Sequence, residues 1–203
     1  MKKNWTLLIA AIGLSLSLAF KGDKPLLEFG AKAPMADMEM KDISGKSYSL
    51  ETLNAENGLL VIFSCNTCPF VIGWEDQYPG LKAIADEQKI GMVLVNSNEK
   101  KREGDDSMME MVKHAKEAGY TMPYVIDKNN KLADAFGART TPHVFLFNKD
   151  LKLVYRGSIN DKYENRSKEA EDFYLEKALK ALGTNMEIDP KDTRELGCSI
   201  KRV

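Results

Sequence analysis

The sequence predicts a single α/β domain in which helices cover both faces of a central mixed β-sheet. Three observations predict this fold class: short apolar segments suited to buried strands, amphipathic segments that alternate with them, and a length of 203 residues, which fits one ordinary domain. Because strands and helices alternate along most of the chain, some strands should pair in parallel through helical crossovers.

The expected elements follow one another without an internal repeat. A β-hairpin over residues 38–50 turns at Ser44-Gly45-Lys46, and a short helix over residues 51–56 ends before Gly58. Pro79 should kink or interrupt the helix that begins at residue 70. The other strands are expected over residues 59–63, 92–95, 124–126, 144–147 and 151–155, and the helices over residues 70–85, 106–118, 132–136 and 168–182.

Composition and charge place the chain among folded, water-soluble proteins. Hydrophobic residues make up 43% and charged residues 29%, which disfavours disordered, collagen-like and polytopic membrane proteins. The 29 Lys and Arg against 30 Asp and Glu leave a net charge of -1, so the basic surplus typical of nucleic-acid-binding proteins is missing. The charged segment 99–106 is expected to be a solvated loop on the surface.

Residues 1–20 have the layout of a secretory signal peptide. Lys2 and Lys3 precede an apolar stretch, and Ser17 and Ala19 supply small side chains at the spacing that signal peptidase requires. We therefore expect an exported protein, periplasmic or secreted, with no stable membrane span after cleavage; an uncleaved membrane anchor is the alternative. The expected division of the chain is a signal peptide over 1–20, a lead-in over 21–32, the folded domain over 33–183 and a C-terminal tail over 184–203.

Two cysteines, Cys65 and Cys68, lie between a predicted buried strand and the start of an amphipathic helix. Pro69 suits the first turn of a helix, so Cys68 should fall at or near the N-cap, where backbone N–H groups and the helix dipole favour a thiolate. Cys65 is close enough to form a disulfide with Cys68, so the pair can store two electrons. A purely structural disulfide would gain little by closing so short a loop, and a zinc site would need two further ligands.

A second motif, Thr141-Pro142, lies directly before the strand expected over residues 144–147. A strand, a C-x-x-C pair and a helix, followed by T-P at the mouth of a later strand, resemble the thioredoxin fold. The opening with Ala33-Pro34 is similar to that of the exported thioredoxin-like and redoxin group, the alkyl hydroperoxide reductase and thiol-specific antioxidant (AhpC/TSA) proteins. This resemblance implies that Pro142 is a cis-proline and that the backbone of Thr141 pairs with a substrate chain during disulfide exchange.

The resemblance implies a thiol–disulfide oxidoreductase of the cell envelope that needs no metal or nucleotide cofactor. Cys68 is expected to attack the disulfide of a partner, and Cys65 then closes the internal bridge and releases the partner. The spacing from Phe63 in thioredoxins also favours Cys68, although the reverse order of the two cysteines stays open. The expected partners are proteins or small molecules that contain thiols or disulfides, and an upstream thiol reductant.

Two other functions remain open at this point. In a thiol peroxidase, Cys68 would become a sulfenic acid that Cys65 or Cys198 resolves, but Val61 and Cys65 occupy the places of the proline and threonine of the peroxiredoxin motif. A copper-delivery protein resembling the Sco family would use the two cysteines with His143, but that family separates its cysteines by three residues.

Cys198 lies near the C-terminus, in the segment Leu196-Gly-Cys-Ser-Ile-Lys201. It is a candidate resolving cysteine, because a terminal tail can swing back over a site or reach another subunit. A free surface thiol or a buried plug is the alternative interpretation.

Overall fold

The computed structural model describes residues 24–164 and 169–203. The expected signal peptide over residues 1–20 lies outside these ranges. Within them, no helix is both long enough and apolar enough to span a bilayer.

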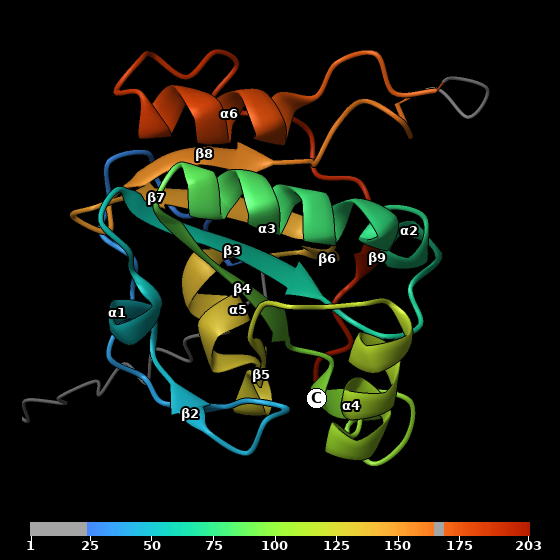
Figure 1. Cartoon of the computed structure of the whole chain (residues 1–203). Coiled ribbons are helices and arrows are strands. Elements are labelled where there is room, and N and C mark those ends of the chain that lie inside the picture. The colour runs from blue at the N-terminus through green and yellow to red at the C-terminus, as the bar shows by residue number, and fades with distance from the viewer. Residues whose placement is uncertain (1–23, 165–168) are drawn as a thin grey trace, which may run out of the picture.

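A five-stranded mixed sheet forms the centre of the molecule, as the sequence predicts (Figure 1). The central strand β3 (Gly58–Ser64) is buried along its whole length, which explains why its residues are almost all apolar. Val61 of β3 pairs with Val93 in parallel and with Phe145 in antiparallel orientation. From edge to edge, the strands are β5 (Tyr124–Ile126), β4 (Ile90–Asn96), β3 (Gly58–Ser64), β7 (His143–Asn148) and β8 (Leu153–Gly157).

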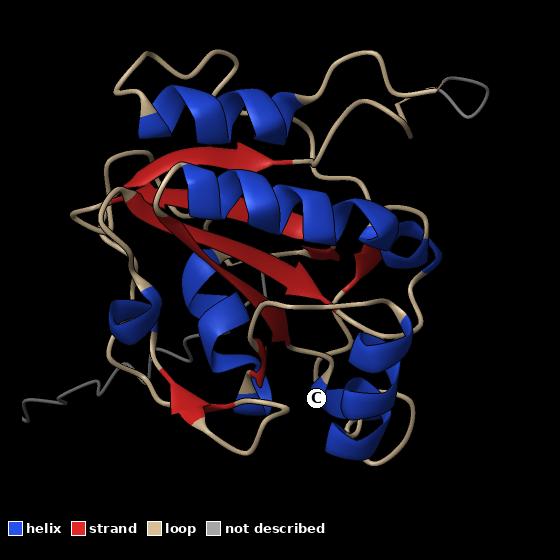
Figure 2. Cartoon of the chain, viewed as in Figure 1, coloured by secondary structure: helices blue, strands red, loops and turns tan. Residues whose placement is uncertain are grey.

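Helices cover both faces of this sheet (Figure 2), so the predicted fold class is confirmed. One face packs against α3 (Tyr78–Glu87), α4 (Met108–Glu117) and α6 (Tyr174–Gly183). The other face packs against α1 (Leu50–Leu53) and α5 (Lys131–Phe136). Alternate residues of β3 therefore enter two separate apolar cores, as the twofold repeat of a strand requires.

The N-terminal β-hairpin is present as β1 (Met40–Lys41) and β2 (Ser47–Tyr48), which pair in antiparallel orientation. The short helix α1 follows directly. Ser49 caps it, because the Ser49 hydroxyl accepts a hydrogen bond from the backbone N–H of Thr52 while the Thr52 hydroxyl accepts one from the backbone N–H of Ser49.

The helix expected to begin at residue 70 is divided into three pieces. They are α2 (Pro69–Ile72), the 3₁₀ turn η1 (Glu75–Gln77) and α3, and Pro79 lies in the first turn of α3. Proline lacks an N–H group, so its place at a helix start rather than in a helix interior is the expected outcome. The helix that begins beside Cys68 is therefore only four residues long, much shorter than the helix over residues 70–85 that the sequence predicts.

The expected tail over residues 184–203 ends in a strand that the sequence did not predict. Strand β9 (Cys198–Ser199) pairs in antiparallel orientation with β6 (Thr140–Thr141), so that Thr141 lies opposite Cys198. In Figure 1, β6, β9 and α2 lie together at one end of β3. The remaining short elements are the 3₁₀ turns η2 (Glu99–Lys101) and η3 (Lys128–Asn130).

Candidate active site

Cys65 and Cys68 lie just beyond the carboxyl end of β3, where the chain turns into α2. Cys68 is the N-cap residue of α2 and Pro69 is its first residue, as the sequence predicts. Both sulfur-bearing side chains are buried: Cys65 is 1% exposed and Cys68 is 4% exposed. All three cysteines are free thiols, so the structure represents the reduced protein.

Thr141 contacts both cysteines of the pair. Its hydroxyl Oγ1 lies 3.2 Å from Cys65 Sγ, and its backbone oxygen lies 3.0 Å from Cys68 Sγ, which donates to it when it is a thiol. The Thr141–Pro142 peptide bond is cis, as the resemblance implied. The T-P motif and the C-x-x-C motif, 73 residues apart between Cys68 and Thr141, therefore form one site.

The environment of Cys68 favours a thiolate. The Cys65 thiol donates to Cys68, and this contact is the largest of the causes that lower the pKa of Cys68 to about 4. Burial opposes the shift, whereas hydrogen bonds from the Cys198 thiol and from the backbone N–H groups of Val71 and Cys198 add to it. The start of the helix thus lowers the pKa of Cys68 through the Val71 N–H group, but the neighbouring Cys65 thiol lowers it more.

The other two cysteines keep their protons more firmly. The hydrogen bond to Cys68 is the first cause that raises the pKa of Cys65, and burial is the second. Burial is the first cause that raises the pKa of Cys198 to about 11, followed by its hydrogen bond to Cys68. The cluster therefore holds one anionic sulfur, Cys68, between two thiol donors.

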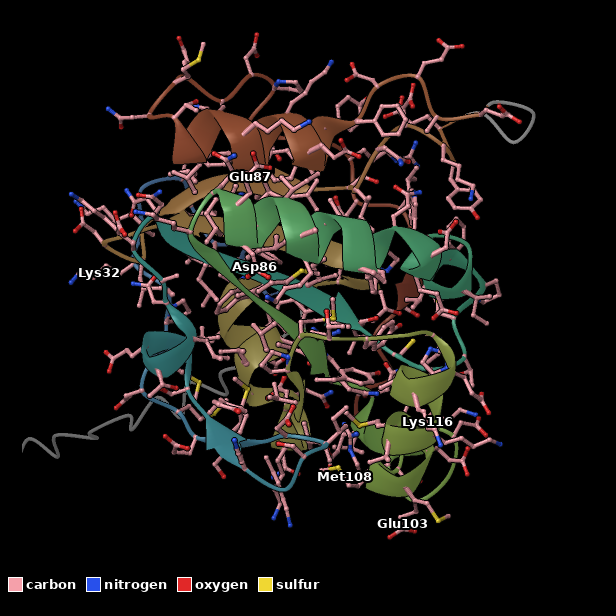
Figure 3. The ribbon with its side chains drawn as sticks, in the orientation of Figure 1. Lys32, Asp86, Glu87, Glu103, Met108 and Lys116 are labelled. Atoms are coloured by element: carbon pink, nitrogen blue, oxygen red, sulfur yellow. The ribbon has the colours of Figure 1, made fainter. Side chains whose placement is uncertain are left out.

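The loop that the sequence placed in solvent contributes a buried carboxylate to this site. Glu103 in that loop is exposed (Figure 3), but Asp106 is fully buried. Asp106 accepts hydrogen bonds from the backbone N–H of Asn66 at 2.9 Å and from the side-chain amide of Asn98 at 3.0 Å. The expectation of a wholly solvated loop is wrong, because the C-x-x-C turn has a backbone donor that needs an acceptor inside the protein.

His143, which the copper-delivery alternative would use, and the nearby Arg139 have other partners. His143 is 1% exposed, its Nδ1 accepts from the backbone N–H of Arg139 at 3.3 Å, and burial lowers its pKa to about 3. The Arg139 guanidinium lies 3.5 Å from the Glu195 carboxylate. Over residues 24–164 and 169–203, no cluster of three or more His, Cys, Asp or Glu side chains is arranged to hold a metal ion.

Comparison with known proteins agrees with this fold. The family model described as "AhpC/TSA family" matches residues 29–156, which is more than half of the chain. The chain belongs to the AhpC/TSA family. This family assignment, together with the relatives below, confirms the predicted enzyme class, a thioredoxin-like thiol–disulfide oxidoreductase.

Relatives of this AhpC/TSA protein include a thiol-disulfide oxidoreductase ResA from Geobacillus thermodenitrificans (strain NG80-2). The two are 27% identical over 150 residues, which cover 72% of this chain and 79% of the relative. An uncharacterized conserved protein from Geobacillus kaustophilus has a similar structure, with a TM-score of 0.80 and 31% identity over 86% of this chain and 92% of that one. A hypothetical protein from Sinorhizobium meliloti 1021 also has a TM-score of 0.80, with 26% identity over 88% and 97% of the two chains.

Proposed function

We propose that this protein exchanges disulfides with thiol- or disulfide-containing partners of the cell envelope through Cys65 and Cys68. The observation that carries the proposal is geometric: Cys65 Sγ lies 3.2 Å from the Thr141 hydroxyl and Cys68 Sγ lies 3.0 Å from the Thr141 backbone oxygen, so both cysteines meet at the residue before the cis-proline. The adjacent Cys65 thiol also lowers the pKa of Cys68 to about 4. A stabilised thiolate next to a second thiol is what attack on a disulfide, followed by internal closure, requires.

In the first step, the Cys68 thiolate attacks one sulfur of a partner disulfide. A bond forms between Cys68 and that sulfur, the partner's disulfide breaks, and its second sulfur leaves as a thiolate that takes a proton from solvent. Thr141 and Pro142 lie against the site of this mixed disulfide and would position the substrate once strand β9 no longer occupies the β6 edge. Cys68 is then neutral and no longer accepts a hydrogen bond from Cys65.

In the second step, Cys65 attacks Cys68 and releases the partner. The hydrogen bond to the Cys68 thiolate is the first cause of the raised pKa of Cys65, and it disappears once Cys68 is bonded to the partner. Cys65 therefore loses its proton more readily at the moment when it is needed as a nucleophile. The partner leaves with both sulfurs reduced, and the protein keeps a Cys65–Cys68 disulfide; the reverse sequence oxidises a partner dithiol.

The test compares insulin reduction by dithiothreitol in the presence of wild-type protein and of Cys68→Ser. We expect wild type to accelerate reduction and Cys68→Ser to be inactive. The variant Cys65→Ser/Cys198→Ser should accumulate mixed disulfides on Cys68, because both thiols that contact Cys68 have been removed. Trapping through Cys65 in Cys68→Ser would reverse the order of the cysteines, and peroxide consumption without disulfide exchange would favour a thiol peroxidase.

We also propose that the enzyme acts outside the cytoplasm, with its leader removed by cleavage after about Ala19. N-terminal sequencing of protein from the periplasmic fraction or the medium of expressing cells tests this. Recovery of an intact N-terminus in the membrane fraction would instead indicate an uncleaved anchor.

A further inference from the structure

The C-terminal strand of the protein lies where a substrate chain would pair with the active site. Strand β9 pairs in antiparallel orientation with β6, and Cys198 lies opposite Thr141, the residue before the cis-proline. The backbone edge that the resemblance assigns to a substrate is thus taken by the chain itself. This arrangement presents a cysteine, Cys198, to Cys68 in the way that a bound substrate would present its own.

Contacts of the three residues at positions 200–202, just after β9, hold the strand in place. Ile200 is 5% exposed within an apolar core, and its backbone N–H donates to Arg139 O at 3.0 Å. The backbone N–H of Lys201 donates to the Asn98 side chain at 2.8 Å, and the Arg202 guanidinium lies 2.8 Å from Asp134. The strand is therefore docked by burial, hydrogen bonds and charge, and its register is fixed.

Gly197 permits this close approach. A Cβ atom at position 197 would lie 2.4 Å from Thr141 O and 2.8 Å from the Thr141 carbonyl carbon. Both are backbone atoms, which cannot turn aside as the end of a flexible side chain can. Any other residue at position 197 would push Cys198 away from the active site.

The three sulfurs differ in their access to solvent. Cys65 and Cys68 are buried, whereas Cys198 is partly exposed. These three cysteines, with Asn98, Thr141 and neighbouring residues, line a cavity of about 70 Å³. Because Cys198 is the partly exposed residue of the three, a large partner reaches it more easily than Cys68 while β9 is docked.

We propose that Cys198 is a third redox cysteine, which forms an internal disulfide with Cys68 and makes this disulfide accessible to partners. The inference rests on the proposed function. The exchange starts from the Cys65–Cys68 disulfide, and the Cys198 thiolate attacks Cys68 Sγ. The Cys68–Cys198 bond forms and the Cys65–Cys68 bond breaks. Cys65 leaves as a thiolate and takes up the proton that Cys198 gave up. This exchange is redox-neutral.

A partner thiolate then attacks Cys198, and Cys68 leaves as a thiolate. Cys68 is the better leaving group of the two, because its pKa is lowered whereas that of Cys198 is raised. The partner's second thiol attacks its own sulfur in the mixed disulfide and releases Cys198 as a thiol. In total, two partner thiols become a disulfide, and the protein gains two electrons and two protons; run in reverse, the same steps reduce a partner.

The test uses Cys65→Ser, which retains Cys68 and Cys198. The reduced variant is treated with one equivalent of diamide at micromolar concentration, and its disulfides are mapped by mass spectrometry of non-reduced peptides. Because docking holds the thiols at an effective concentration of roughly millimolar or higher, the bond should form within one molecule. We expect a Cys68–Cys198 peptide from the monomer; two remaining thiols, or dimers alone, would overturn the proposal.

A matched control moves the thiol by one residue. In Cys65→Ser/Cys198→Ser/Ser199→Cys, the new thiol lies one residue further along the same strand, where the alternation of a strand is expected to turn it away from Cys68. We expect at least about tenfold less intramolecular crosslink, since the docked register no longer supplies the high effective concentration. Equal crosslinking would show that a loose tail, not the β6–β9 register, brings the sulfurs together, and would also overturn the proposal.

The insulin assay separates this inference from the proposed function. If wild type accelerates reduction but Cys65→Ser forms no Cys68–Cys198 bond, the proposed role of Cys198 is wrong, whereas the proposed thiol–disulfide exchange remains supported. If the bond forms but wild type exchanges disulfides with no partner, the proposed function fails, and the assignment of Cys198 as a cysteine that serves partners fails with it.

Discussion

Replacing Gly197 by alanine is expected to detach the C-terminal strand without changing any cysteine. The added Cβ would lie 2.4 Å from Thr141 O, whereas ordinary contacts begin at 3.4 Å. The strand would have to withdraw by about 1 Å, and overpacking of this kind costs about 1–3 kcal/mol. The hydrogen bond from Ile200 N–H to Arg139 O, now 3.0 Å long, would then exceed the normal range.

Two measurements can detect the detachment of strand β9. Urea denaturation should show an unfolding free energy lower by about 1–3 kcal/mol, a shift in midpoint of about 1 M for a slope of about 2 kcal/mol/M. Alkylation of Cys68 should have its inflection at higher pH, because Cys198 supplies two of the hydrogen bonds that lower the Cys68 pKa. One hydrogen bond to a charged group contributes about 1.5–3 kcal/mol, or about one to two pKa units.

Gly80→Ala is the matched control. A Cβ at position 80 meets nothing within 4 Å, and Gly80 lies inside α3, where alanine is the better helix former. Its stability should be equal to or higher than that of wild type, with an unchanged pH profile for Cys68. If Gly197→Ala matches wild type in both measurements, the tight contact between Gly197 and Thr141 does not exist in solution.

The other predictions concern the thiolate and its supports. Cys65→Ala should raise the pH of half-maximal Cys68 alkylation by about one to two units, and Cys65→Ser by less, because serine still donates a hydrogen bond; equal profiles would remove Cys65 as the donor. In native wild type, Cys68 should be alkylated rapidly at pH 6 and lose reactivity only as the pH falls toward about 4, whereas in urea the rate should follow an ordinary thiol with a pKa of about 8.5. Asp106→Ala should lower the free energy of unfolding by about 2–4 kcal/mol, because buried donors, including Asn66 N–H, lose their acceptor; a loss within experimental error would show that water replaces the carboxylate. Ile200→Ala should cost about 2–5 kcal/mol in the same denaturation experiment, and a cost near zero would mean that the tail is not part of the core.

The sheet could be predicted from the sequence because its strands are buried. The segment expected over residues 59–63 became β3, and the segment expected over 124–126 became β5 with the same bounds. A strand enclosed on both faces must be apolar at nearly every position, so it leaves a continuous signal. The expected last helix over residues 168–182 begins later, at Tyr174, where its apolar stripe first meets the sheet.

Other parts of the site left no comparable signal. Asp106 is one carboxylate in a charged segment, and only the folded chain shows that it turns inward to Asn66 N–H. Strand β9 has two residues, too few to show a periodicity, and the apolar residue that docks it in a core, Ile200, lies just beyond it. The one visible clue was Gly197 beside Cys198, since a glycine next to a reactive residue often marks a close backbone approach.

The three cysteines acquire different chemistry from one shared set of hydrogen bonds. Because Cys68 accepts from both Cys65 and Cys198, each donor lowers its pKa while its own pKa is raised. Forming either disulfide removes the Cys68 thiolate, and with it one of the causes that raise the pKa of the remaining thiol. The remaining cysteine is thereby prepared to attack, whichever bond has formed. Because both neighbours of Cys68 are prepared in the same way, the exchange between the two internal disulfides is reversible. Cys198 is the partly exposed cysteine, so a partner reaches the Cys68–Cys198 disulfide from the side of Cys198.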